Sequence, residues 1–319
     1  MPSQRDAIKR ASSEEVSALI DFGEQQAFHG SPVEGIEPLL RAVALARANT
    51  DFEVLLRAEW LLGVCYGASG DYARALEILE PQVASDIDGA RYRSQGMACT
   101  TIASIYRQVA EHARAEEFDQ FALVISDGDP EVEFDAKLGL VADAVGLGDD
   151  KLAKSRLRVA DRAAVDAPGW RTDVRLGWVR CEIGLLTNDH QAAVEGANQA
   201  VDIARRANAP RHRAKSLMFL GASHLAWSQS KKLKSNHRKT GVAKLRDSVK
   251  ISDRLGATPL VWPVRLILAS EESGLRAKDR QREHRLAKKA IRKMVSGMSA
   301  DMGSGWLARL RAQGVDLRP

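Results

Sequence analysis

The sequence is poor in aromatic residues and in cysteine, and both shortages limit what the protein can be. Aromatic residues make up 5% of the 319 positions, and there are three cysteines. Cys65, Cys99 and Cys181 stand far apart, with no CxxC pair. Neither a disulfide framework nor a structural zinc site is therefore expected, and a reducing cytoplasm fits this cysteine usage best.

The sequence also lacks long apolar runs. Residues 1–13 are polar and charged, and no apolar core follows them, so a secretory signal is not expected. The most apolar stretch, 260–269, is interrupted by Pro263 and Arg265 and is too short to cross a bilayer. We expect a cytoplasmic protein that has no membrane partner.

Catalytic motifs are missing as well. The seven histidines show no HExxH spacing, and the segment 146–151, GLGDDK, lacks both the GxxxxGK[ST] spacing and a preceding strand. Each cysteine falls inside an expected helix, where a small buried apolar role is favoured over a nucleophile. We therefore predict a non-enzymatic protein with no catalytic residue, no metal site and no cofactor.

The residues that are abundant are helix formers. Hydrophobic residues make up 45% of the chain, Ala, Leu and Arg are frequent, and strand-favouring runs are scarce. The 24 glycines and 10 prolines fall mostly between periodic segments. This composition predicts an all-α protein with short turns.

One helix–turn–helix unit recurs along the chain. In its clearest copy, a helix with Leu62, Gly63 and Tyr66 on one face ends at a turn, and a second helix carries Ala75 and Leu79. Small or apolar residues return in the first helix at intervals of 38 or 40 residues: Gly23, Gly63, Ala103, Val141, Cys181 and Gly221. Twelve residues after each of the first five comes another small residue: Gly35, Ala75, Ala115, Ala153 and Ala193. Polar turns separate the two sets, so successive helices can approach closely in the same way in each unit.

This unit resembles the tetratricopeptide repeat, whose pattern runs Leu-Gly-x-x-Tyr, a Gly-Asp/Asn-Tyr turn, and then Ala. The period of about 40 residues exceeds the standard 34 and resembles the longer repeats in the sensor regions of MalT-like bacterial regulators and of some diguanylate cyclases. The resemblance covers about 15–255 and concerns architecture only. It implies a right-handed α-solenoid, or superhelix, of about seven antiparallel helix pairs.

The register divides the chain into four parts. We expect an N-terminal polar segment at 1–13, six tetratricopeptide-like pairs at 14–257, an atypical basic seventh pair at 258–297, and a tail at 298–319. The tail contains Gly303 and Gly305 and is expected to form a flexible link into a short helix that caps the array.

The resemblance also suggests where a ligand binds. In tetratricopeptide proteins the ligand-facing positions of the first helix lie six and three residues before the first small position, and one and four after it. Transferred to this sequence, they give a concave groove for a peptide or protein segment, with Leu138 and Leu225 as apolar floor. The residues predicted to bind are Arg57, Trp60, Met97, Arg107, Arg175, Trp178, Lys215 and Met218. Packing of the two tryptophans between repeats, and cations that are merely solvated, are the alternatives.

Charge is unevenly distributed. Residues 201–319 hold 27 Lys or Arg and 9 Asp or Glu, a net charge of +18, whereas 1–200 carry −13. Two clusters account for much of the positive charge: Lys231, Lys232, Lys234, Arg238 and Lys239, and then Arg282, Arg285, Lys288, Lys289, Arg292 and Lys293. A solvated face, nucleic acid, an acidic partner or the acidic half of a second copy all fit them. Nucleic acid is not favoured, because no recognition helix or stacking motif accompanies the charge. A stand-alone sensor with a separate effector is a further alternative.

Overall fold

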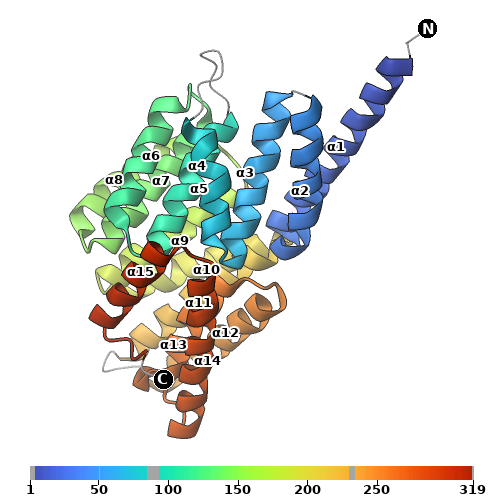
Figure 1. Cartoon of the computed structure of the whole chain (residues 1–319). Coiled ribbons are helices and arrows are strands. Elements are labelled where there is room, and N and C mark those ends of the chain that lie inside the picture. Colours follow the sequence, from blue (N-terminus) through green and yellow to red (C-terminus); the bar gives the residue numbers. More distant parts are fainter. Residues whose placement is uncertain (1–3, 50, 85–92, 230–233, 318–319) are drawn as a thin grey trace.

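The computed structural model describes residues 4–49, 51–84, 93–229 and 234–317, and these residues form helices without any strand. The helices follow one another along the chain with short connections (Figure 1). Their bounds are α1 Gln4–His29, α2 Pro32–Asn49, α3 Phe52–Ser69, α4 Tyr72–Ala84, α5 Arg93–Gln108, α6 His112–Ile125, α7 Pro130–Gly146, α8 Asp150–Asp166, α9 Trp170–Leu186, α10 His190–Arg206, α11 Pro210–Ser228, α12 Lys234–Arg254, α13 Thr258–Ala269, α14 Ala277–Ser296 and α15 Ala300–Ala312. A short 3-10 turn, η1 Glu271–Ser273, precedes α14.

Neighbouring helices pack in pairs, from α1 with α2 to α13 with α14, and each pair stacks on the next. The predicted all-α solenoid of helix pairs is confirmed. The small positions identified in the sequence are all buried: both the set that begins at Gly23 and the set that begins at Gly35. A Cβ on Gly63 would lie 2.6 Å from the Leu79 side chain, so the first helix of this pair can approach the second only because it has no side chain there.

The turns within the pairs repeat the same local chemistry. The residue that ends the first helix has a positive φ in four successive pairs, at Gly70, Ala110, Gly148 and Asn188. In three of these turns the next residue is an aspartate whose carboxylate accepts a hydrogen bond from the backbone three residues later, as Asp149 does from the Leu152 N–H at 2.9 Å. A left-handed residue followed by a capping aspartate closes one helix and starts the next within two residues.

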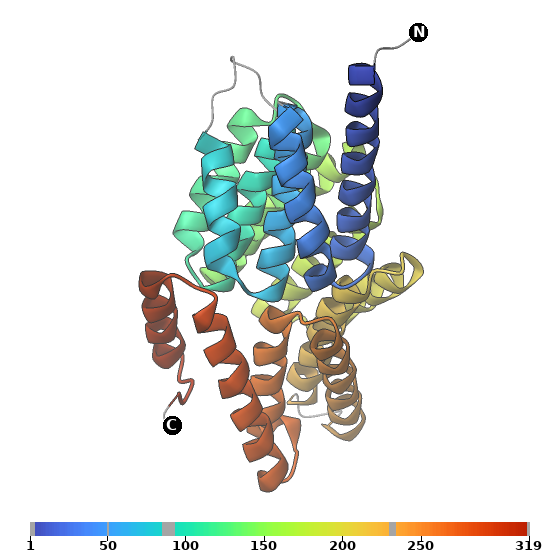
Figure 2. The same cartoon turned by 45° about the vertical axis from the view of Figure 1, so that its right-hand side comes forward.

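The stack curls, so that helices from distant parts of the sequence lie against one another (Figure 1, Figure 2). At the N-terminal end, the His29 Nδ1 lies 3.1 Å from the carbonyl oxygen of Ala207, 178 residues away. Ser31 in the same turn donates to the Leu255 carbonyl at 3.4 Å. The first helix pair therefore contacts the connections that follow α10 and α12.

The C-terminal end closes the curl from the other side. The Ala73 N–H donates to the Gly297 carbonyl at 2.8 Å. Arg309 of α15 donates to the Val109 carbonyl at 2.7 Å and to the Glu111 carboxylate at 2.6 Å. Trp306 is 1% exposed and belongs to the same apolar cluster as the cores of the first three helix pairs. We call α15 and these contacts the C-terminal clasp.

One expectation about the C-terminal end needs correction. Gly303 and Gly305 do not form a flexible link, because both lie inside α15. Ser299 accepts a hydrogen bond from the Met302 N–H at the start of this helix, and the buried Trp306 holds it, which together offset a cost of about 1 kcal/mol for each helical glycine. α15 contacts the last pair of the stack, since the Trp306 ring meets Trp262 of α13 edge-on with centroids 5.3 Å apart, and it also bonds to the turn after α5 through Arg309.

The N-terminal polar segment is helical from Gln4 onward, as the first part of α1. In the described parts of the chain, every helix is either too short or too polar to reach across a lipid bilayer.

Candidate functional site

The curled stack encloses a cavity of about 520 Å³ on its inner side. Its wall is built by the first helix of each pair, α3, α5, α7, α9, α11 and α13, together with Phe28 at the end of α1 and His112 at the start of α6. The other second helices stand outside this wall because each first helix buries one face against its own partner and presents the opposite face inward. Ligand cavities in proteins commonly have volumes of about 300–1,000 Å³, so this one has the size of a site for a small molecule or a short peptide.

Most of the residues predicted for the groove line this cavity. The seven that do are Trp60, Met97, Arg107, Arg175, Trp178, Lys215 and Met218, and Leu138 lines it as well. Arg57 does not: it is exposed and pairs with Glu24 of α1 at 2.5 Å. Leu225 is 3% exposed and packs in the apolar core between α12 and α13. The predicted ligand-facing positions therefore line the cavity in the central pairs. They do not do so for Arg57, which pairs with α1, or for Leu225, which packs against α12.

Two of the predicted cations are held by carboxylates within the wall. Arg107 contacts Asp119, and its guanidinium lies 2.9 Å from a carboxylate oxygen of Asp143; both aspartates are fully buried. Arg175 contacts Asp135, which Arg171 also approaches at 3.4 Å. These pairs join α5 to α6 and α7, and α7 to α9, so they hold neighbouring repeats in register as well as lining the cavity.

Aromatic stacking orders the wall between α9 and α11. The Trp178 Nε1–H donates to the Ser216 hydroxyl at 2.8 Å, and His212 stacks on its ring with centroids 5.5 Å apart and planes 13° apart. The Lys215 ammonium lies 4.2 Å from the centroid of the same ring. Trp178 therefore packs between repeats and also supports a cation at the cavity surface.

Arg211 lines this wall and has no carboxylate partner among the described residues. Its Nε is buried without a hydrogen-bond acceptor, and the Nδ1 of the adjacent His212 is also buried and unpaired. Burial, aided by the neighbouring guanidinium groups, holds the pKa of His212 well below its usual value, so the imidazole is neutral. Burial also lowers the pKa of Lys215 to about 8, although Glu182 opposes this shift.

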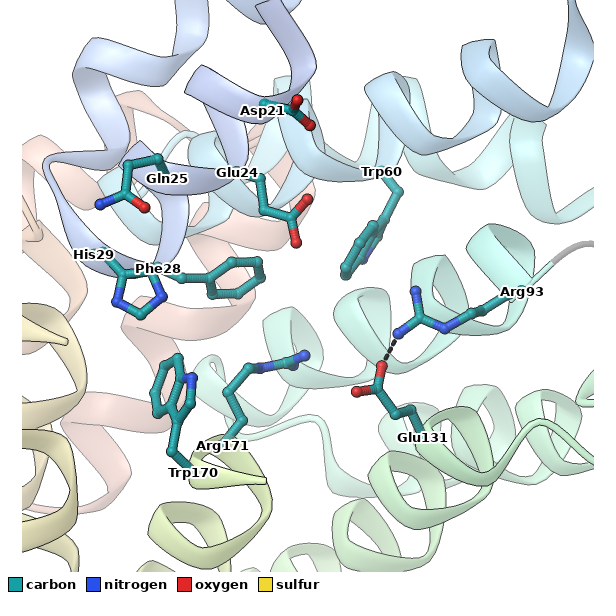
Figure 3. Close-up of a pocket in the computed structure, with 10 residues that line it drawn as sticks. All are labelled: Asp21, Glu24, Gln25, Phe28, His29, Trp60, Arg93, Glu131, Trp170 and Arg171. Carbon is teal, nitrogen blue, oxygen red and sulfur yellow. Dashed lines mark ion pairs between the residues drawn. The ribbon is translucent and has the colours of Figure 1, made fainter. Parts of the chain in front are cut away.

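A second, smaller cavity of about 350 Å³ opens beside the first, where α1, α3, α5, α7 and α9 converge. Figure 3 shows Phe28, Trp60 and Arg171 pointing into it from three different helices, with the Arg93–Glu131 ion pair at its rim. Those three residues line both cavities. The Arg171 guanidinium lies 4.8 Å from the Phe28 ring centroid, so the two cavities share an aromatic and cationic boundary.

Comparison with known proteins finds a solved structure that has a similar fold. The crystal structure of a Rap protein complexed with competence and sporulation factor superimposes with a TM-score of 0.59 at 10% sequence identity, covering 95% of this chain and 88% of the Rap chain. No protein-family model and no curated protein sequence matches the chain. In fold, the chain is a tetratricopeptide-like helical-repeat protein. At this identity the likeness concerns the fold.

Some residues of this tetratricopeptide-like cavity were within reach of the sequence but were not singled out. Asp135 and Glu182 occupy the same ligand-facing positions as the predicted residues, six before and one after a first small position. Arg171, Arg211 and His212 lie nine or ten residues before such a position, near the start of their helices. The curl of the stack brings them inward, and no periodicity within a single repeat predicts that.

The two basic clusters lie at the far end of the tetratricopeptide-like stack. In the first cluster, Lys231 and Lys232 are outside the described residues, as is the side chain of Lys234; Arg238 is half-buried and Lys239 is exposed. In the second, Lys288 is half-buried, and the others are exposed on α14: Arg282, Arg285, Lys289, Arg292 and Lys293. A Cβ on Gly274, just before α14, would meet the Arg238 side chain at 2.7 Å, so the clusters are neighbours in space.

Proposed function

We propose that this protein is a non-enzymatic regulatory adaptor that binds a short peptide segment of a partner in the inner cavity. The observation that carries the proposal is Arg211, a guanidinium that lines the cavity with its Nε buried and without an acceptor. Because a buried polar group without a partner costs about 1–3 kcal/mol, a ligand that supplies the acceptor gains from a group already in place.

Charge indicates which chemical group that ligand offers. On the wall formed by α9 and α11 the cations are Arg171, Arg175, Arg211 and Lys215, and the carboxylates facing them are Asp135 and Glu182. Asp135 serves two arginines, and Glu182 is separated from Lys215 by more than an ion-pair distance. The surplus of two positive charges favours a carboxylate, which arginine binds with two parallel hydrogen bonds.

The rest of the cavity suits the apolar side chains of the same peptide. Trp60, Met97, Met218 and Trp262 line it beside Leu138. Aromatic and thioether groups make adaptable apolar contacts, while the cations fix the orientation of the chain. A peptide with one acidic group and neighbouring apolar residues fits this arrangement better than a uniformly polar ligand.

The structural comparison supports a binding role by analogy only. The Rap protein with the same fold is complexed with competence and sporulation factor. Fold alone does not determine function, so the weight of the proposal lies on the cavity residues. We further propose a cytoplasmic setting, from the three unpaired cysteines.

The test uses a pool of random pentapeptides with free carboxyl termini, captured by the intact chain and identified by mass spectrometry. We expect enrichment of peptides that combine an acidic group with apolar residues. Arg211→Met, which keeps the length of the side chain but removes the charge, should lose at least about tenfold in affinity for the enriched peptides.

The matched control is Arg213→Met, which changes an exposed arginine two residues further along α11. It should bind as the unmodified chain does, and both variants should keep their helical circular dichroism. Absence of any enrichment, or equal losses in the two variants, would remove the cavity from consideration as the binding site.

A further inference from the structure

The last helix of the stack carries cations on the face that it turns away from the protein. On α14 the residues Lys278, Arg282, Arg285, Lys289 and Arg292 follow one another at intervals of four, three, four and three, and Lys293 lies beside the last of them; all six are exposed. With 3.6 residues per turn, this spacing places them within one narrow face. We call these six residues the cationic stripe.

The opposite face of α14 is the one that packs. Ala287, Ala290, Ile291 and Met294 are buried, and they lie about half a turn around the helix from the stripe. α15 packs against Trp262 of α13 through Trp306, and in the part of the chain that the structure describes no helix covers the outer face of α14. Figure 2 shows α14 at the outer end of the stack, apart from α15.

The acidic residues of α14 do not neutralise the stripe. Glu283 lies 2.8 Å from Arg265 of α13, and Asp279 lies 2.9 Å from Arg276. None of the six stripe cations has an ion-pair or hydrogen-bond partner among the described residues. A hollow of about 390 Å³, lined in part by Arg280, His284 and Arg285, adjoins the start of the stripe.

We propose that the cationic stripe binds the phosphodiester backbone of a nucleic-acid duplex, without reading its sequence. From Lys278 to Lys293 the stripe extends over about 22 Å, with a cation about every 5 Å. Lysine and arginine that neutralise phosphates supply most of the sequence-independent affinity for duplexes. This surface is separate from the inner cavity, and the inference does not depend on the peptide proposal.

The stripe has no exposed apolar groups, and this argues against a membrane surface or an acidic protein as its partner. A helix that lies in a membrane surface needs exposed apolar side chains to insert, and those of α14 are buried in the fold. Protein interfaces have apolar or aromatic centres and are poor in lysine, whereas no large apolar residue lies within the stripe. Contacts with the phosphates of a duplex need only the positive charges that the stripe carries.

The probe is a fluorescein-labelled 20-base-pair DNA duplex of arbitrary sequence, titrated with the full chain and followed by fluorescence anisotropy. If about five cations contact phosphates, the logarithm of the affinity should fall with a slope of about −4.5 against the logarithm of salt concentration, or about 500-fold from 50 to 200 mM salt. Arg285→Glu, Lys289→Glu and Arg292→Glu together should weaken binding at 50 mM salt by more than tenfold and reduce the steepness of the slope to about −2.

The control is Lys151→Glu, Arg158→Glu and Arg162→Glu on α8, which changes three exposed cations and shifts the net charge equally. It should leave the slope and most of the affinity unchanged. Equal losses in the two triple variants, or no binding of the duplex at 50 mM salt, would overturn the proposal. So would tighter stripe-dependent binding to polyglutamate or to phosphatidylserine vesicles than to the duplex.

Discussion

Gly177 and Gly196 mark a close approach between the two helices of the fifth pair. A Cβ on Gly177 would lie 2.8 Å from the Gly196 carbonyl oxygen and 3.0 Å from the Cβ of Ala200. Both atoms are fixed by the backbone of α10, so no side-chain rotation relieves the collision in Gly177→Ala. The two helices must separate by a few tenths of an ångström, against the packing of the pairs on either side.

The magnitude follows from two opposing effects. Overpacking of a well-packed core costs about 1–3 kcal/mol, while alanine in place of a helical glycine gains about 0.8–1 kcal/mol. Because the backbone of α10 fixes the positions of the colliding atoms, the upper part of the first range applies, and we expect Gly177→Ala to lose about 1–2 kcal/mol of folding free energy. Gly67→Ala on α3 is the matched control, since its Cβ would meet nothing closer than the Ile105 side chain at 3.7 Å. Gly67→Ala should increase the free energy of unfolding by about 0.5–1 kcal/mol.

Thermal unfolding followed by far-ultraviolet circular dichroism separates the two outcomes. At about 2–4 °C per kcal/mol, Gly177→Ala should lower the Tm by about 2–8 °C, and Gly67→Ala should raise it by about 1–4 °C. If Gly177→Ala unfolds at or above the temperature of the unmodified chain, the reasoning that small residues set the distance between paired helices is wrong.

Three more predictions concern the cavity, the clasp and the thiols. Since burial lowers the pKa of Lys215 to about 8, raising the pH from 7 to 9 should remove most of its charge and weaken binding of an enriched acidic peptide by up to about tenfold. Lys215→Arg should abolish this pH dependence. A pH profile that Lys215→Arg leaves unchanged would contradict this assignment. Trp306→Ala should lower the free energy of unfolding by about 3–5 kcal/mol. The rate of amide hydrogen exchange should then rise in α15 and also at the turns after α3 and α5. A rise confined to α15 would show that the clasp does not support those turns. Burial raises the pKa of each cysteine thiol to about 12, so alkylation at pH 8 should proceed only on unfolding, and rapid labelling of the native chain would show that the helix cores open.

The helix pairs were predictable because the packing requirement recurs. Gly63 approaches Leu79 for the same steric reason that Gly23 approaches Leu39, and the interval between such positions is visible in the sequence. The turn residues were equally informative, since Gly70-Asp71 and Asn188-Asp189 combine a left-handed residue with a capping carboxylate. These determinants are local, and so the sequence indicates them directly.

The closure of the stack was not predictable in the same way. Arg309 bonds to the Val109 carbonyl, 200 residues away, and nothing in the tail distinguishes such a contact from an ordinary surface arginine. The glycines of α15 suggested flexibility because the docking of Trp306 is a property of the assembled fold. For the same reason Arg211 was missed as a cavity residue: its orientation depends on how far the whole array curls.

The C-terminal clasp has a consequence for the folding of this protein during its synthesis on the ribosome. An open repeat array can gain structure pair by pair as the chain emerges, because each pair needs only its neighbour. Here, the turns at Gly70 and Ala110 lack their final contacts until residues near 297 and 309 have been made. The inner cavity therefore reaches its finished shape only after residue 309 has been made, and until then a nascent chain should leave Met97 and Trp60 accessible to chaperones.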